Sequence, residues 1–484
     1  MFQSALITVF SFAIGATLAK IDERNFPVDH IITKDVAIIG GGASGTYAAV
    51  RLREDFDTSI ILIEKKPRLG GHVDTYVLPN NQTTIEYGVQ SYIRYKGATD
   101  FFTRLGVDIL PSNQRRLTSV NVDIETGKAL TGYTPPTPNA TTEALQRWLT
   151  LLEKYEAFME PGYWNFPAPN SIPSDLLVPF GEFAKTHSLE DAAPRIMVVS
   201  NVGLGGLKDV LTLYVMQAFG APITRGMLAP APDGLFVPDG SNSLLYQHAY
   251  TLLKKDVLLS SYVSEAERTN TEVRLVVQAP DGEYLIKAKR LLFTPPPSLK
   301  PSLQSFAVDK KEKEVFREWV PTWSFVGIMN IPCIPENYSI AYISSAAVPS
   351  DHLAIRDYPY TLRLDSTGPS GLGLFRVLFG TNFTITTEEA KQIISEDVQK
   401  LVAVGTVNYT GDCTLDFRAF ADHNSVLWPL TSEQLRQGFV QKLNALQGHR
   451  STWYTGSSWC GHYSSNVWAF TDTVLPKLLK GLKG

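Results

Sequence analysis

A glycine-rich turn near residue 40 constrains the fold of this chain more than any other feature. Residues 36–39 are apolar and mostly β-branched, which predicts a buried parallel strand, and residues 46–55 predict a helix. The turn between them has GxGxxG spacing, in which the glycines permit a tight turn, a close approach of backbone to pyrophosphate, and close packing of helix on strand. We therefore expect the turn and the first helical amides to bind phosphate through Gly40, Gly42, Ala43, Ser44 and Gly45.

A second apolar run, residues 59–63, ends at Glu64, which lies 19 residues beyond Gly45. An acid at this distance accepts hydrogen bonds from the ribose hydroxyls of a dinucleotide, and it disfavours a 2′-phosphate and hence NADP. A glycine motif alone is weak evidence, but this one lies inside a strand–helix–strand unit. The sequence therefore predicts an α/β fold with a Rossmann-type domain.

The composition is that of a large globular protein. The chain has 484 residues, of which 44% are hydrophobic, and at about 100–200 residues per domain it has room for two to four domains. Its 44 basic and 48 acidic residues give a net charge of −4, so we expect no nucleic-acid partner. Its three cysteines include no CxxC pair, which argues against a metal site.

The amino terminus resembles a secretory leader. Residues 5–18 are uncharged and largely apolar, and small residues precede Lys20, so we expect residues 1–19 to be a signal peptide and the mature chain to have no membrane span. Cys333 and Cys413 are available to pair in an oxidising compartment, which would leave Cys460 free. Five N-glycosylation sequons also favour secretion: Asn81, Asn139, Asn337, Asn382 and Asn408.

The segment after Glu64, residues 65–72, reads KKPRLGGH. It resembles the R-x-G-G motif of the flavin-containing amine-oxidase and phytoene-desaturase superfamily, whose members bind FAD through two dinucleotide-binding segments. The resemblance implies that FAD, rather than NAD alone, is the cofactor, and that this loop lies along it. The implied contacts are Arg68, Gly70, Gly71 and His72.

Further segments match the same superfamily in order: residues 86–90, residues 238–244, a predicted strand at 257–263, a predicted strand at 291–296, and residues 452–456 and 466–470. Residues 273–278 and 283–288 predict two strands of a hairpin that leads into the strand at 291–296. The resemblance implies additional cofactor contacts at Gly88, Val263, Gly456, Asn466 and Val467. It also implies an FAD-binding domain built from residues 35–92, 236–297 and 452–484. The intervening residues, 93–235 and 298–451, would form a mixed α/β substrate domain, so that the two domains are interleaved in the sequence.

Within this superfamily the chain is most similar to the secreted fungal β-cyclopiazonate dehydrogenase type. Amine oxidases of the superfamily carry a lysine in a substrate-domain strand, but the corresponding residues 323–329 contain none. This favours dehydrogenation of an apolar secondary metabolite, with or without ring closure, over simple amine oxidation. His462 stands where the superfamily has an aromatic residue over the flavin, so it is the candidate proton acceptor, with Trp459 and Tyr463 beside the substrate.

Several alternatives remain open from the sequence. FAD could be covalently attached through His72 or Cys460, or bound without a covalent link. The electron acceptor could be O2 or another molecule. The rival functions are an amine or amino-acid oxidase that releases H2O2, a flavin-binding module without catalysis and, disfavoured by Gly70 and Gly71, an NAD-only dehydrogenase.

Overall fold

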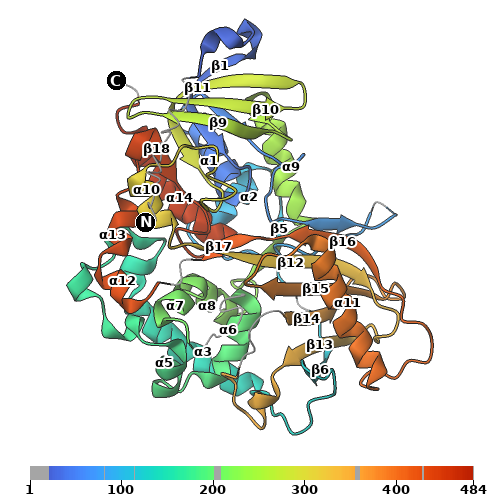
Figure 1. The fold of residues 1–484 in the computed structure, drawn as a ribbon. Coiled ribbons are helices and arrows are strands. Elements are labelled where there is room, and N and C mark those ends of the chain that lie inside the picture. The colour runs from blue at the N-terminus through green and yellow to red at the C-terminus, as the bar shows by residue number, and fades with distance from the viewer. Residues whose placement is uncertain are drawn as a thin grey trace, which may run out of the picture.

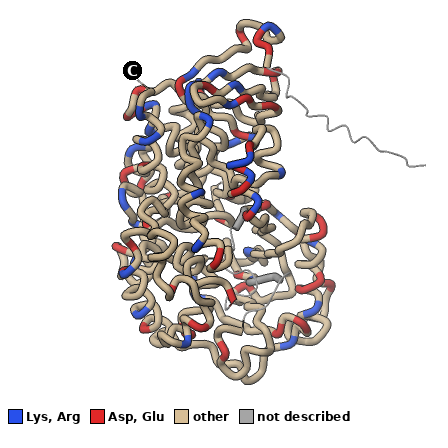
Figure 2. Tube along the Cα trace, turned by 60° about the vertical axis from the view of Figure 1, so that its left-hand side comes forward, with Lys and Arg blue, Asp and Glu red and all other residues tan. Residues whose placement is uncertain are grey.

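The computed structural model describes residues 21–80, 82–113, 115–200, 209–354, 360–427 and 430–482. The predicted signal peptide and the sequon at Asn81 lie outside these residues. Within them, no helix is long and apolar enough to cross a membrane. Basic and acidic residues are interspersed along the described part of the trace (Figure 2).

The first sheet carries the glycine-rich turn at the end of one central strand. Its strands follow the order β8–β2–β1–β11–β10–β9, and β18 pairs with the end of β11. Their bounds are β1 Ile31–Ile39, β2 Ile60–Ile63, β8 Val257–Leu258, β9 Tyr262–Arg268, β10 Val273–Ala279, β11 Gly282–Phe293 and β18 Thr452–Tyr454. Strands β2, β1, β11 and β18 are parallel, so their carboxyl ends meet at one edge, as in other nucleotide-binding sheets.

Four helices pack beside this sheet (Figure 1). They are α1 Ala43–Glu54, α2 Ala98–Arg104, α9 Asn242–Leu253 and α14 Ser464–Leu479. Helix α1 contacts both α9 and α14, and the indole N–H of Trp468 in α14 donates to the carbonyl of Ala43 at 3.1 Å. The first and last helices of the unit therefore begin close together, at the edge where the parallel strands end.

The second sheet lies at the lower right of Figure 1 and has the order β16–β12–β15–β14–β13–β6, with β17 paired to β12. Its strands are β6 Thr118–Asp123, β12 Val320–Asn330, β13 Tyr338–Ile343, β14 Tyr360–Ser366, β15 Leu374–Thr381, β16 Asp416–Asp422 and β17 Ser425–Leu427. Helix α11 (Thr387–Ala403) runs alongside it and buries Ile394, Val398 and Leu401.

A group of helices fills the lower left of the molecule (Figure 1). It includes α3 Pro138–Glu153, α4 Glu156–Met159, α5 Phe180–Thr186, α6 Ala193–Ser200, α7 Thr212–Ala218 and α8 Ala221–Leu228. The remaining helices are α10 Lys310–Phe316, α12 Ser432–Arg436 and α13 Phe439–Asn444. Two small antiparallel pairs complete the fold: β3 Thr75–Val77 with β4 Thr84–Glu86, and β5 Ile109–Pro111 with β7 Phe236–Pro238.

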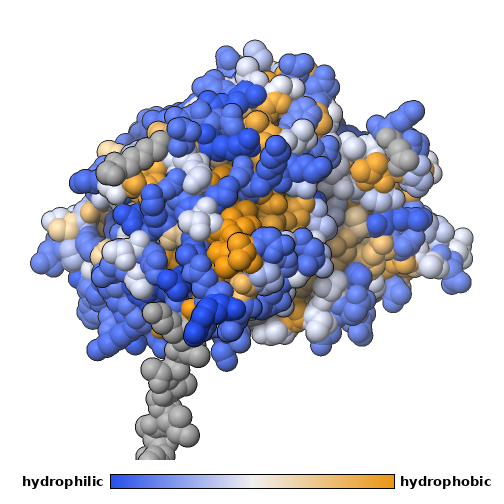
Figure 3. Space-filling view, turned by 90° about the horizontal axis from the view of Figure 1, so that it is seen from above, coloured by the Kyte–Doolittle hydropathy of each residue, from blue (hydrophilic) through white to orange (hydrophobic). Residues whose placement is uncertain are grey.

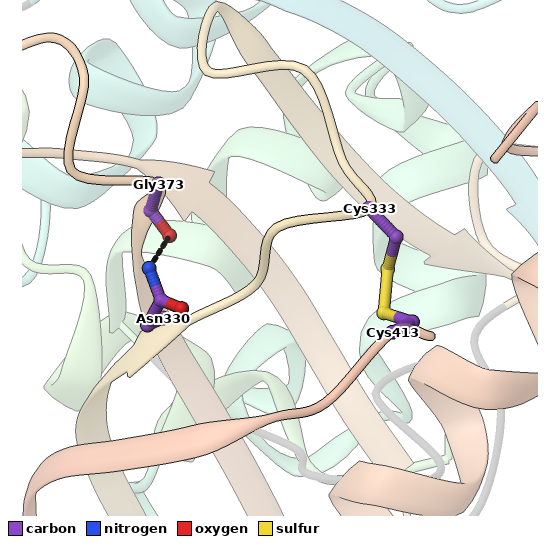
Figure 4. The surroundings of a disulfide bond; sticks show 4 residues. All are labelled: Asn330, Cys333, Gly373 and Cys413. Carbon is purple, nitrogen blue, oxygen red and sulfur yellow. Dashed lines mark hydrogen bonds between the residues drawn. A yellow bond between two sulfur atoms is a disulfide. The ribbon is translucent and has the colours of Figure 1, made fainter. Parts of the chain in front are cut away.

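Cys333 and Cys413 form a disulfide, which ties the segment after β12 to the segment before β16 (Figure 4). The amide of Asn330 donates to the Gly373 carbonyl nearby. Cys460 is a buried free thiol. The sequon residues Asn139, Asn337, Asn382 and Asn408 are all exposed. The face seen in Figure 3 is mostly hydrophilic, with a hydrophobic group at its centre.

Two strand predictions differ from the structure. The predicted strand over residues 257–263 is two strands, because Ser260 adopts a left-handed φ of 51° and Ser261 donates its amide to the Glu64 carbonyl instead. Conversely, the predicted strands at 283–288 and 291–296 are one strand, β11, which pairs with β10 along its first half and with β18 at its end.

Candidate functional site

The glycine turn lies at the amino terminus of α1, with Gly42 as the residue that precedes the helix. Gly40 has a φ of 92°, which favours glycine. A Cβ on Gly45 would lie 1.8 Å from the Gly40 carbonyl oxygen, so only glycine lets the helix begin this close to the strand. The free amides of Ala43 and Ser44 and the positive end of the helix dipole suit a phosphate group.

Glu64 is anchored at this turn. It is 5% exposed, and one carboxylate oxygen accepts from the Gly41 amide at 2.6 Å while the other accepts from the Lys66 amide at 2.7 Å. Its position at the end of β2, next to α1, is where a Rossmann domain receives the ribose of its dinucleotide.

The loop after β2 crosses the glycine turn at close range. A Cβ on Gly71 would lie 2.9 Å from Gly42 Cα, and the Gly70 amide donates to the Gly41 carbonyl at 2.8 Å. Gly71 also has a φ of 55°. Any larger residue at position 71 would enter the space directly beside the second glycine of the motif.

His72 lies next to a second histidine that the sequence did not single out. Its ring stacks on that of His423, which follows β16, with centroids 4.3 Å apart. His423 Nε2 lies 2.9 Å from a carboxylate oxygen of Asp74. Arg68 also pairs with Asp74, so its guanidinium faces this carboxylate rather than the glycine turn. A Cβ on Gly88 would lie 2.1 Å from the His72 carbonyl oxygen, so the 86–90 segment packs tightly beneath the pair.

The closing segment brings the chain's last site residues to the same edge. Strand β18 lies beside β11, and a Cβ on Gly456 would lie 2.7 Å from the Thr294 carbonyl oxygen and 3.6 Å from Ser44 Oγ. Asn466 and Val467 lie in the first turn of α14 and are 2% and 3% exposed. Val263, in contrast, lies in β9, where it pairs with Val277.

His462 and His72 share an unusual environment. Both rings are exposed, yet burial within the protein lowers the pKa of His462 from 6.5 to about 4 and that of His72 well below 6.5. The charges of His423 and Lys66 lower the pKa of His72 further. Both histidines are therefore accessible residues with protein packed closely around them, which favours their neutral imidazole form.

The other predicted residues near His462 are more deeply packed. Trp459 is 2% exposed and stacks on Tyr454, with centroids 5.2 Å apart. Tyr463 stacks on His462 at 4.5 Å. Cys460 is 1% exposed, its thiol lies near the Gly456 and Gly461 carbonyls, and burial raises its pKa well above 9. It is therefore a buried, neutral thiol.

Unpaired polar atoms gather in this closing segment. Among the described residues, four buried polar atoms at positions 458–466 have no hydrogen-bond partner: Ser458 Oγ, Trp459 Nε1, Tyr463 Oη and Asn466 Oδ1. Buried polar groups in native proteins are nearly always paired, so a cluster of unpaired ones indicates a ligand. Together with the Gly42–Gly71 cradle, these atoms fit a flavin dinucleotide that runs from α1 to α14.

Glu160, which precedes a loop packed on α14, is a site residue that the sequence analysis missed. Its carboxylate accepts from the Asn466 amide at 3.0 Å, and burial raises its pKa to about 8. The one local signal is an acid amid aromatic and apolar residues, in the stretch AFMEPGYW at 157–164. The pairings of Glu160 with Asn466 and of Asp74 with His423 leave no local pattern.

Comparisons with known proteins agree with this arrangement. A family model described as an NAD(P)-binding Rossmann-like domain matches residues 38–105. The chain is 31% identical to the FAD-dependent oxidoreductase pigF of Monascus ruber, over 99% of this chain and 98% of that protein. It is 30% identical to the β-cyclopiazonate dehydrogenase of Aspergillus flavus, over 96% of each chain.

Solved structures share the architecture. The fold matches a fatty acid isomerase from P. acnes with a TM-score of 0.66 and 18% identity, over 92% of this chain and 98% of that one. It matches wild-type putrescine oxidase with a TM-score of 0.57 and 15% identity, over 93% of this chain and 99% of that one. These matches confirm the predicted fold class, an α/β chain with a Rossmann-type domain in an amine-oxidase-like architecture.

Proposed function

Because the chain belongs to the family of FAD-dependent oxidoreductases that includes β-cyclopiazonate dehydrogenase, we propose that it binds FAD and dehydrogenates an apolar secondary metabolite, with or without ring closure. Family membership confirms the expected resemblance and the expected enzyme class, an oxidoreductase. The observation that carries the proposal is the close packing of Gly71 on Gly42, where a Cβ on Gly71 would lie 2.9 Å from Gly42 Cα. This packing puts the loop after β2 directly beside the phosphate turn.

When bound, FAD supplies the two-electron chemistry by accepting a hydride. The chain's own residues bind and orient it. The amides at the start of α1 would hold the pyrophosphate, and Glu64 would hold the ribose. The start of α14 would stabilise negative charge near the ring, because a helix amino terminus carries partial positive charge.

His462 is the proposed catalytic residue. The residue is exposed and its ring stacks on Tyr463, just before α14, and its lowered pKa keeps it neutral at pH 7. A neutral imidazole has a free nitrogen lone pair, so it would accept the proton that the substrate loses when it is dehydrogenated. The substrate then leaves with two hydrogens fewer and one new bond.

The substrate class follows from what the second sheet offers. Strand β12 contains no lysine, and its residues Val326 and Ile328 are buried beside Leu378. This supports an apolar substrate oxidised at C–H or N–H rather than a simple amine. O2 and other acceptors both remain candidates for taking the electrons from the reduced cofactor.

Covalent attachment of FAD is a narrower form of the proposal, and His72 is the better of the two candidates. His72 is exposed and its lowered pKa keeps the imidazole neutral, so it is a competent nucleophile. Cys460 is buried and protonated, and a thiol rather than a thiolate is a poor nucleophile. We therefore propose attachment through His72.

We also propose that the protein enters the secretory pathway, with residues 1–19 as a leader. The Cys333–Cys413 disulfide supports an oxidising compartment. The four exposed sequon asparagines are accessible to glycosylation. Treatment of the secreted protein with a glycosidase should lower its apparent mass. A protein that stays in the cell extract, with a mass that the glycosidase does not change, contradicts this proposal.

The function is tested by anaerobic mixing of the purified protein with a panel of apolar secondary metabolites, β-cyclopiazonate among them, and with a panel of simple amines. The proposal predicts that an apolar metabolite bleaches the flavin absorption and that amines do not. His462→Asn should retain FAD while slowing bleaching by about 10²–10⁴-fold. Bleaching by amines alone, with stoichiometric peroxide in air, would instead indicate an amine oxidase.

A further inference from the structure

We propose that Glu160 is a positioning residue that fixes the side-chain amide of Asn466, so that the amide oxygen is presented to the flavin ring. The inference rests on the proposed FAD site, because the group that Asn466 would meet is the cofactor. Glu160 lies between α4 and the loop that packs on α14, and no motif of the sequence marks it.

The contact between the two side chains determines which way the amide points. Asn466 Nδ2 donates to Glu160 Oε2 at 3.0 Å. The Glu160 oxygen that meets Nδ2 acts as an acceptor, which the carbonyl oxygen of the neutral acid and the carboxylate can both do, so the NH2 group faces Glu160 and the amide oxygen points away. Asn466 Oδ1 is accordingly a buried acceptor without a partner among the described residues. The pyrimidine edge of a flavin carries a ring N–H, which is the donor that such an acceptor needs.

The position of Glu160 is set by packing along a single face of α14. Two residues beyond it, a Cβ on Gly162 would lie 2.4 Å from the Phe470 ring. Two residues further, the Trp164 indole donates to Thr473 Oγ1 at 2.7 Å and stacks on Phe470. Positions 466, 470 and 473 are spaced by four and three residues and therefore share one helix face. The loop is thereby held against α14, with Glu160 at its start.

The surroundings of Glu160 leave room for its carboxyl group. A Cβ on Gly220 would lie 2.5 Å from Glu160 Oε1, so a larger residue there would force this carboxyl group to shift. A cavity of about 10 Å³, lined in part by Glu156, Met216 and Gly220, adjoins the same carboxyl and has room for about one water. Glu160 is thus accommodated next to α14, and no arginine or lysine of the described residues forms an ion pair with it.

The charge of Glu160 depends on pH in the working range. Burial raises its pKa to about 8; the bond from Asn466 and the charge of Arg225 oppose this shift, and Glu156 adds to it. The negative charge of Glu160 in turn raises the pKa of four neighbouring groups: Tyr95, Tyr163, Cys460 and Tyr463. Glu160 is therefore neutral at pH 7 and ionises above about pH 8. The negative charge that then appears beside the first turn of α14 would disfavour an anionic reduced flavin.

The test compares Glu160→Gln, Glu160→Ala and a matched control, Glu153→Gln, in full-length protein loaded with FAD. Glu153 pairs with the same Arg225 but is exposed. The readouts are FAD content, and flavin absorbance and reduction potential measured on both sides of pH 8. We expect a midpoint near pH 8 in the wild type and in Glu153→Gln. Glu160→Gln should keep FAD but lose the midpoint, and Glu160→Ala should bind FAD about tenfold more weakly.

The outcomes separate this inference from the proposed function. A wild type that holds FAD but has no midpoint near pH 8, or a midpoint unchanged in Glu160→Gln, overturns the inference and leaves the FAD proposal standing. A wild type that holds no flavin overturns both. Because glutamine has the shape of glutamate, Glu160→Gln carries the test even where Glu160→Ala fails to fold.

Discussion

The ring of His423 stacks on the ring of His72 with centroids 4.3 Å apart and planes 13° apart, although the two residues belong to distant segments. His72 follows the glycine pair after β2, whereas His423 follows β16 of the second sheet and donates its amide to the Ser324 carbonyl. Asp74 holds the second ring in place through the 2.9 Å contact. The stack therefore links the second sheet to the cofactor loop.

Removal of the His423 ring should leave the His72 ring less well oriented. We expect His423→Ala to reduce the fraction of flavin that stays with the protein after acid precipitation, because His72 loses the surface that orients it. His423→Phe keeps a ring for stacking but loses the bond to Asp74, so it should fall between the alanine variant and the wild type. Equal acid-stable flavin in all three proteins would exclude an orienting role for His423.

The close approach of Gly71 to Gly42 gives a sharper prediction. Gly71→Ala should lower FAD affinity by at least tenfold, because its Cβ would lie 2.9 Å from Gly42 Cα in the space beside the phosphate turn. Gly106→Ala is a matched control, since Gly106 has a similar φ of 65° but open space around it. Affinity is measured by titrating each apoprotein with FAD. An equal loss in both variants would mean that backbone strain, and not the cradle, sets affinity.

These relationships show what the sequence alone could predict. The GxGxxG turn, Glu64 and the two-glycine loop were predictable because each is encoded within a few residues, by spacing that a strand and a helix impose. The pairs His72–His423 and Glu160–Asn466 were not, because each joins residues more than 300 positions apart. The break in the predicted strand over residues 257–263 was also missed. It depends on a left-handed backbone at Ser260, and left-handed positions are predictable from the sequence mainly where a glycine occupies them.

A buried ion pair outside the site should control stability. Arg268 and Glu312 are both fully buried and pair at 2.6 Å, and Tyr454 of β18 donates to the same carboxylate at 2.9 Å. Glu312→Ala would leave Arg268 buried without its counter-charge, so we expect a loss of about 3–5 kcal/mol in the free energy of unfolding. The exposed pair of Arg418 with Asp416 is the control, and Asp416→Ala should cost under about 1 kcal/mol. Urea unfolding measures both, and similar costs would contradict the account.

The pKa of His462 predicts how the stability of the apoprotein depends on pH. Burial lowers this pKa from 6.5 to about 4, so between these values the unfolded chain binds a proton that the folded chain does not. Stability should therefore fall as pH decreases from about 6.5 toward 4. His462→Gln should show a shallower fall in melting temperature over this range, whereas His30→Gln, on the surface beside Tyr284, should follow the wild type. Parallel curves for all three proteins would place the His462 ring in open solvent.

The most direct test of the central claim is the absorption spectrum of the purified wild-type protein, followed by analysis of the cofactor released or retained on acid precipitation. The account predicts the visible bands of an oxidised flavin at about one FAD per chain. Flavin that remains in the pellet of the wild type and of Cys460→Ser, but not of His72→Ala, would match the proposed attachment. A colourless protein from a host with ample FAD, or one that carries only NAD, would contradict the account.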